Sequence, residues 1–144
     1  SIPLLYPKIG DIFLNDRIWF RNKEGKYGVL DHSGKEIRAA QYDRATNFYD
    51  DKAIVYKDGF ASFIDKKGNL LLDYQYKQAQ YQREQFVVTN EAGYVGLLNA
   101  ELKEIIPCQY KRISQAVGAE KYYWSAILKN DTVHKYTKKG EQIN

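Results

Sequence analysis

Short runs of apolar residues alternate with short polar stretches along the whole chain. The runs are rich in Val, Ile, Leu, Phe and Tyr, and the stretches between them are rich in Asp, Asn, Lys and Gly. Turn residues recur every 8 to 12 positions, a spacing that is typical of an antiparallel β-meander. The pattern therefore predicts an all-β protein with little or no helix.

The same pattern returns at a fixed interval of 34 residues. Three series of positions share this interval: Asp31, Asp65 and Asn99; Ile37, Leu71 and Ile105; and Tyr42, Tyr76 and Tyr110. A short fixed period indicates a repeat architecture, in which copies of one supersecondary unit bury their apolar faces against each other. We expect a single repeat domain, residues 1–144, with full units at 26–59, 60–93 and 94–131 and partial units at 1–25 and 132–144.

Each full unit is expected to hold four short antiparallel strands. In the first unit these strands are predicted at 26–30, 35–39, 42–47 and 53–56. In the second unit the second strand is predicted at 70–72, where three leucines follow one another. The units then form a tandem array of four-stranded meanders.

Recurring turn chemistry is expected between the first two strands of a unit. In the first unit Asp31 caps this turn and Gly34 supplies a positive φ. In the third unit Leu102 replaces the glycine, and because Leu is costly at positive φ, we expect that turn to be built differently. Gly28 and Gly96 lie inside first strands, where a missing Cβ lets another backbone come close.

The two partial units complement each other. Residues 1–25 supply the last two strands of a unit, and residues 132–144 supply the first two. The ends can pair and close the array like a propeller, which removes exposed sheet edges, or the units can stack as an open β-solenoid. The sequence leaves both arrangements open.

Two segments resemble the WG-repeat family, whose tandem β-repeats are common in bacterial proteins. The family pattern G-K-W-G-F-I-D-x-x-G followed by I-P-P-x-Y-D is matched by GKYGVLDHSG at 25–34 and by IPCQY at 106–110. The Trp of the pattern is replaced in every unit, by Tyr27, Ala61 and Val95. The resemblance implies a divergent member with a β-repeat fold and a scaffold role in a bacterial protein, and it implies no reaction.

Catalytic and cofactor chemistry has no visible basis in the sequence. Cys108 falls at the end of a predicted strand and is interpreted as a small core residue, rather than a nucleophile. His32 is expected to be solvated in a turn, and His134 to be packed at a strand. These residues give no metal-ligand spacing, and no P-loop or dinucleotide motif is present. We therefore expect a protein that is not an enzyme and needs no cofactor or metal.

Charge and composition argue against a nucleic-acid partner and a membrane span. The 22 Lys and Arg residues against 18 Asp and Glu residues leave a net charge of +4, spread along the chain rather than gathered in one patch. This spread favours a solvated surface over nucleic-acid binding. No apolar run approaches the roughly 20 residues of a membrane helix.

The sequence gives weaker information about the cellular compartment and about the ends of the chain. The single cysteine, Cys108, neither requires nor excludes an oxidising compartment, and we slightly favour a secreted, periplasmic or surface location over the cytoplasm. Because the chain begins at Ser1 and contains no Met, we expect a processed form or a segment of a longer protein.

The connections between the third and fourth strands differ between units, while the rest keeps register. They lie at 11–16, 46–51, 80–85 and 114–123, and in a stacked array they would line one edge, where function is commonly carried. Seven residues in and beside these connections are the predicted binding residues: Phe48, Tyr49, Tyr81, Arg83, Tyr122, Tyr123 and Trp124.

These residues suggest two kinds of partner. Exposed aromatic side chains with an Arg favour a protein partner, so the leading hypothesis is a non-catalytic interaction module. Aromatic platforms for carbohydrate or cell-envelope glycan are the alternative. A third interpretation of Phe48 and Trp124 is that they are core aromatics at strand ends.

Overall fold

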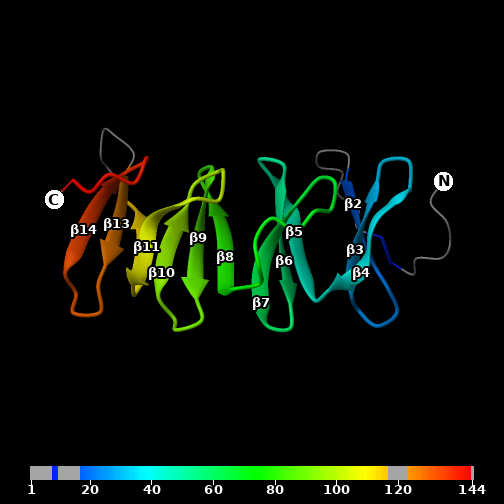
Figure 1. Cartoon of the computed structure of the whole chain (residues 1–144), viewed down its shortest axis with the longest axis horizontal. Coiled ribbons are helices and arrows are strands. Elements are labelled where there is room, and N and C mark those ends of the chain that lie inside the picture. The colour runs from blue at the N-terminus through cyan, green and yellow to red at the C-terminus, as the bar shows by residue number, and fades with distance from the viewer. Residues whose placement is uncertain (1–7, 10–16, 117–122, 144) are drawn as a thin grey trace. The chain divides into compact units, whose positions relative to one another are not determined.

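The computed structural model describes residues 8–9, 17–116 and 123–143. Every element within these ranges is a β-strand, and consecutive strands within each sheet pair in antiparallel fashion, which confirms the all-β prediction (Figure 1). The chain divides into two compact units, Ser1–Gln75 and Tyr76–Asn144. No helix within the described ranges could cross a membrane.

The first unit contains two sheets. One has the order β1-β2-β3-β4, and its strands are β1 (Lys8–Ile9), β2 (Arg17–Arg21), β3 (Tyr27–Asp31) and β4 (Glu36–Tyr42). The other is a meander of β5 (Arg44–Tyr49), β6 (Lys52–Lys57) and β7 (Phe60–Asp65). Only Asp43 separates β4 from β5, so the chain passes directly from one sheet to the next.

The second unit repeats this arrangement. Its first sheet is a meander of β8 (Tyr76–Gln82), β9 (Gln85–Asn90), β10 (Val95–Leu98) and β11 (Glu104–Tyr110). Its second sheet has the order β12-β13-β14, with β12 (Arg112–Gln115), β13 (Tyr123–Ile127) and β14 (Val133–Thr137). Lys111 alone separates the two sheets along the chain.

The sheets are out of phase with the sequence units. The sheet β1-β2-β3-β4 takes two strands from residues 1–25 and two from residues 26–59. Each full sequence unit therefore supplies the last half of one sheet and the first half of the next. Hydrophobic periodicity does not reveal this offset. The β6–β7 turn joins two sequence units and the β3–β4 turn lies inside one unit, yet both join neighbouring strands of a sheet.

Two glycines let neighbouring strands come close, as predicted. A Cβ on Gly28 would lie 2.7 Å from the Arg38 carbonyl oxygen, and one on Gly96 would lie 2.8 Å from the Ile106 carbonyl oxygen. The pairings β3–β4 and β10–β11 both shift register beside these glycines. A bulge of this kind brings one strand closer to its neighbour, and only a residue without a side chain leaves room for it.

The strand predicted at 70–72 is wrong, because this segment forms no strand: Leu70 makes an isolated bridge with Ile64, and the Leu71 amide donates to the Phe63 carbonyl oxygen over 2.8 Å. Ser62 stands where Gly28 and Gly96 stand in the other sheets, and its buried hydroxyl donates to the Leu72 carbonyl oxygen. The side chain of Ser62 thus occupies the space in which the bulged strand would approach. Leu70 and Leu71 remain 43% and 36% exposed.

The prediction for Leu102 is also wrong, because its turn has the same geometry as the turn at Gly34. Leu102 has a φ of 65° and donates its amide to the Asn99 carbonyl oxygen over 2.9 Å, as Gly34 donates to Asp31 over 3.0 Å. The Asn99 side chain also accepts from the Lys103 amide at 2.9 Å. These bonds offset a strain of about 1–2 kcal/mol for a left-handed residue with a side chain.

Removing this strain should stabilise the second unit. We expect Leu102→Gly to raise the free energy of unfolding by about 0.5–1 kcal/mol, since glycine accepts the same φ without steric cost but is freer in the unfolded chain. Urea denaturation measures the change, with Gly34→Leu as the reciprocal variant that should lower it. A less stable Leu102→Gly protein would show that packing of the leucine outweighs the strain.

The turn cap of Asp31 makes stability depend on pH. Hydrogen bonds from the Ser33 hydroxyl and from the Lys35 amide lower the pKa of this carboxyl. A lowered pKa contributes stability above the unfolded value of about 3.9, and this contribution is lost as the pH falls through the folded value.

We expect Asp31→Asn to make the acid loss of stability shallower, because Asn accepts the same bonds without titrating. Denaturation midpoints measured from about pH 6 down to about pH 2 test this range. The reciprocal variant Asn99→Asp should make the loss steeper. Unchanged pH profiles in both variants would contradict the assignment.

Each unit buries a core between its two sheets. In the first unit the main cluster comprises Val29, Tyr42, Phe48, Ala53, Val55 and Ile64. In the second it comprises Leu97, Ile106, Tyr110, Ile113, Trp124, Ala126 and Tyr136. Both clusters take side chains from both sheets, so the sheets of a unit are joined by burial as well as by the chain.

Candidate functional site

One edge of the first unit gathers several turns. Arg17 begins β2 there, beside the β3–β4 turn at 31–35, and its Nε donates to the Lys66 carbonyl oxygen over 2.8 Å. The turn after β7, at 66–68, and the β5–β6 turn, at 50–51, meet through a 4.0 Å approach of Lys66 Nζ to Asp51 Oδ1. We call these residues the first turn edge.

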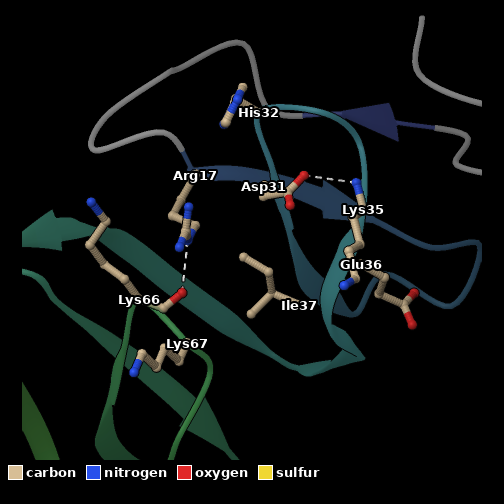
Figure 2. A pocket seen from close by; sticks show the side chains of 8 residues that line it. All are labelled: Arg17, Asp31, His32, Lys35, Glu36, Ile37, Lys66 and Lys67. Atoms are coloured by element: carbon tan, nitrogen blue, oxygen red, sulfur yellow. Dashed lines mark hydrogen bonds between the residues drawn. The ribbon is translucent and has the colours of Figure 1, made fainter.

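A hollow of about 520 Å³ opens at the first turn edge (Figure 2). We call it the basic hollow, and its lining residues are Arg17, Asp31, His32, Lys35, Glu36, Ile37, Lys66 and Lys67. Four of these side chains carry a positive charge at neutral pH and two carry a negative charge. In Figure 2, Lys66 and Lys67 stand on one side of Arg17 and Ile37, and Lys35 and Glu36 stand on the other.

The predicted connections at 46–51 and 80–85 are tight turns rather than variable loops. Asp50 and Asp51 have φ values of 50° and 64°, and Arg83 and Glu84 have values of 49° and 69°. Two successive residues at positive φ are the mark of a type I′ turn, which matches the twist of paired strands. Both connections therefore have the same backbone and differ in side chains. The connections at 11–16 and 117–122 lie outside the described residues.

Two of the predicted binding residues belong to cores. Trp124 is 0% exposed, and its Nε1 donates to Gln85 Oε1 over 2.7 Å. Phe48 is 4% exposed and stacks on Trp19 with ring centroids 5.8 Å apart. The core interpretation holds for both, because a strand end that faces the other sheet buries its aromatic side chain.

The other predicted residues lie at or near the turns. Tyr49 ends β5 and is half-buried, and Tyr81 packs edge-on against Phe86 with centroids 5.3 Å apart. Arg83 is exposed, and its Nε donates to Gln115 Oε1 over 3.1 Å. Tyr123 begins β13, whereas its side chain and all of Tyr122 lie outside the described residues. Binding by these residues stays a prediction.

The histidines are placed as the sequence indicates, whereas Cys108 is half-buried on β11 and is not a core residue. Burial raises the pKa of the Cys108 thiol to about 11, so the thiol stays protonated at neutral pH. His134 on β14 places its Nδ1 2.8 Å from the hydroxyl of Tyr110 on β11, and His32 is exposed. Within the described ranges, no group of three or more His, Cys, Asp or Glu residues is arranged to hold a metal ion.

Sequence reasoning missed the basic hollow. Its cations come from β2, from the β3–β4 turn and from the turn after β7, so they are far apart along the chain. The available signal was the pair Lys66 and Lys67, at the middle positions of a turn whose counterpart in the first unit holds His32 and Ser33.

Residues 27–59 match a family model described as WG containing repeat. This segment is a WG-containing repeat. It runs from the start of β3 to the β6–β7 turn, and Tyr27 and Gly28 occupy the positions that give WG repeats their name. The resemblance seen in the sequence is thus confirmed for this segment.

No curated protein matches the chain. Solved structures similar to it include the computationally designed Ika4 protein, with 14% identity, 87% of each chain covered and a TM-score of 0.46. BamB from Moraxella catarrhalis shows 10% identity over 90% of this chain and 45% of that one, with a TM-score of 0.45. The N-terminal domain of Nup159 shows 10% identity over 99% and 43%, with a TM-score of 0.48.

This chain spans less than half of the latter two proteins. At TM-scores this low, none of the three similarities assigns a topology or a function. The chain is thus an all-β protein that contains a WG repeat.

Proposed function

We propose that this chain is a non-catalytic interaction module. It binds a protein partner through the β5–β6 turn of the first unit and the β8–β9 turn of the second. The observation that carries the proposal is the pair of type I′ turns at 50–51 and 83–84. Their backbones are alike, yet one presents two aspartates and the other an arginine and a glutamate. Fixed turns with different side chains are what a scaffold needs in order to present a specific surface.

Side-chain chemistry near these turns supports a protein partner over a glycan. Phe48 and Trp124 are buried, so they offer no ring face for sugar stacking. Tyr49 and Tyr81 are half-buried and lie beside charged turn residues. Partly exposed tyrosines with an Arg beside them are common at the centres of protein interfaces.

An affinity capture with matched variants tests the proposal. The immobilised chain is used to recover proteins from the organism that produces it, and each recovered protein is purified and tested again for direct binding. We expect the triple variant Tyr49→Ala, Tyr81→Ala and Arg83→Ala to lose the partner. The control replaces exposed residues at the opposite turns, Lys23→Ala, Glu24→Ala and Glu91→Ala, and should retain it.

The outcomes separate the hypotheses. Equal capture by both variants, with folding verified by circular dichroism, would remove the β5–β6 and β8–β9 turns as the binding surface. A glycan array with hits that disappear in the triple variant, together with no direct protein binding, would replace the protein partner with a carbohydrate.

A further inference from the structure

Four cationic and two acidic side chains line the basic hollow, so positive charge is in excess there. The carboxylate of Asp31 is turned into its own turn, where Oδ1 accepts from the Ser33 hydroxyl at 2.7 Å and from the Lys35 amide at 2.9 Å. The Asp31 carboxylate is therefore hydrogen-bonded within its own turn. Glu36 is the remaining carboxylate among the lining residues.

Two of the three lysine side chains that line the hollow, Lys35 and Lys67, have no close carboxylate among the described residues. Among the described residues, no Asp or Glu oxygen is within 4.0 Å of the ammonium of Lys35 or of Lys67. Lys66 Nζ pairs with Asp51 Oδ1 at 4.0 Å. Cations held near one another without counter-charges repel, and an anion between them relieves that repulsion.

The equivalent positions of the second unit are arranged differently. Gln85 takes the place of Arg17, and its Nε2 donates to the Lys138 carbonyl oxygen over 2.6 Å, as Arg17 donates to that of Lys66. Gln85 is neutral and buried, and Lys138 Nζ pairs with Glu84 Oε2 at 3.1 Å. The same backbone contact is thus made by a cationic side chain in the first unit and by a neutral one in the second. The difference resides in side chains and is not a requirement of the fold.

Building on the proposed function, we infer that the basic hollow binds an acidic peptide segment of the protein partner, through at least two Asp or Glu carboxylates. Lys35 and Lys67 each offer an ammonium to one carboxylate, and Ile37 gives apolar contact between them. A volume of about 520 Å³ accommodates a few side chains of an extended segment.

Acidic residues beside the hollow favour a peptide over a nucleic acid. Asp50 and Asp51 lie at the first turn edge, and Asp31 and Glu36 line the hollow itself. A nucleic acid carries a negative charge at every phosphate, so it would meet these carboxylates along its path. A peptide places its carboxylates at separate side chains on a neutral backbone and can avoid them.

Binding of a labelled acidic peptide to the full chain tests this inference. The probe is fluorescein-labelled hexaglutamate followed by anisotropy at low salt, with labelled hexaglutamine as the neutral peptide. We expect hexaglutamate to bind and the double variant Lys35→Gln, Lys67→Gln to weaken it about tenfold, since two charge pairs are lost. The matched control is Lys103→Gln, Lys139→Gln, which removes the same charge from the equivalent exposed positions of the second unit and should leave binding unchanged.

Three results would overturn the inference: no binding of hexaglutamate by the unmodified chain, equal weakening in both double variants, or tighter binding of a labelled single-stranded oligonucleotide that the Lys35→Gln, Lys67→Gln variant loses. Each of these leaves the capture experiment unaffected, because that experiment depends on Tyr49, Tyr81 and Arg83. Conversely, failure of the capture with intact hexaglutamate binding would count against the turn residues and not against the hollow.

Discussion

Replacing Trp124 by alanine should lower the free energy of unfolding by about 3–5 kcal/mol, the usual cost of deleting a buried Trp side chain. Trp124 is fully buried in the second core, and its indole N–H is hydrogen-bonded to Gln85. Loss of the ring leaves a cavity between the two sheets and a buried amide oxygen without its donor. Urea denaturation followed by far-UV circular dichroism measures the change.

Phenylalanine at the same position separates the two contributions. Trp124→Phe keeps most of the ring but leaves Gln85 Oε1 unsatisfied, which should cost about 1–3 kcal/mol for the lost bond. Trp19→Phe is the matched control, because Trp19 Nε1 is buried without a hydrogen-bond partner among the described residues. A Trp124→Phe protein no less stable than Trp19→Phe would show that the bond to Gln85 contributes little.

The second large effect is expected at Gly96. A Cβ there would lie 2.8 Å from the Ile106 carbonyl oxygen and 2.9 Å from the Cys108 amide nitrogen. Both atoms belong to the backbone of β11 and cannot move without opening the bulge. We expect Gly96→Ala to cost about 2–3 kcal/mol, as for other overpacked sites.

Two further variants define the cause. Gly93→Ala should cost only about 1 kcal/mol, because Gly93 has a φ of 93° but no atom within 4 Å of the added Cβ. The Sγ atom of Cys108 also lies 2.7 Å from the Cβ position of Gly96. Removing it with Cys108→Ala should restore little stability to Gly96→Ala. Full restoration would show that the thiol, and not the backbone, sets the limit.

The period of the sequence predicts much of this fold, because the residues that repeat are those that the backbone requires. Asp31 and Asn99 cap their turns, and Gly28 and Gly96 admit a bulged neighbour. Where the repeat is broken, sequence reasoning fails in two opposite ways. Ser62 in place of glycine suppresses a strand, while Leu102 in place of glycine changes nothing in the turn.

The candidate site was harder to predict from sequence. Aromatic residues at strand ends look the same whether they face solvent or the opposite sheet, so Trp124 could not be distinguished from a surface residue. The basic hollow depends on which turns meet at one edge, and that contact is set by strand direction and not by local sequence. Arg17 and Lys66 are 49 residues apart and share one hydrogen bond.

The offset between sheets and sequence units decides where the chain can be divided. A fragment cut to the WG repeat at 27–59 would hold β3 and β4 without their partner β2, and β5 and β6 without β7. Such a fragment would lose the six residue pairs that join β6 to β7, so the edge of β6 would be exposed. It would hold two half-sheets with open edges. Neighbouring copies of the repeat thus share a sheet. Duplicating one copy adds a whole sheet, whereas one copy cut out by itself holds two incomplete sheets.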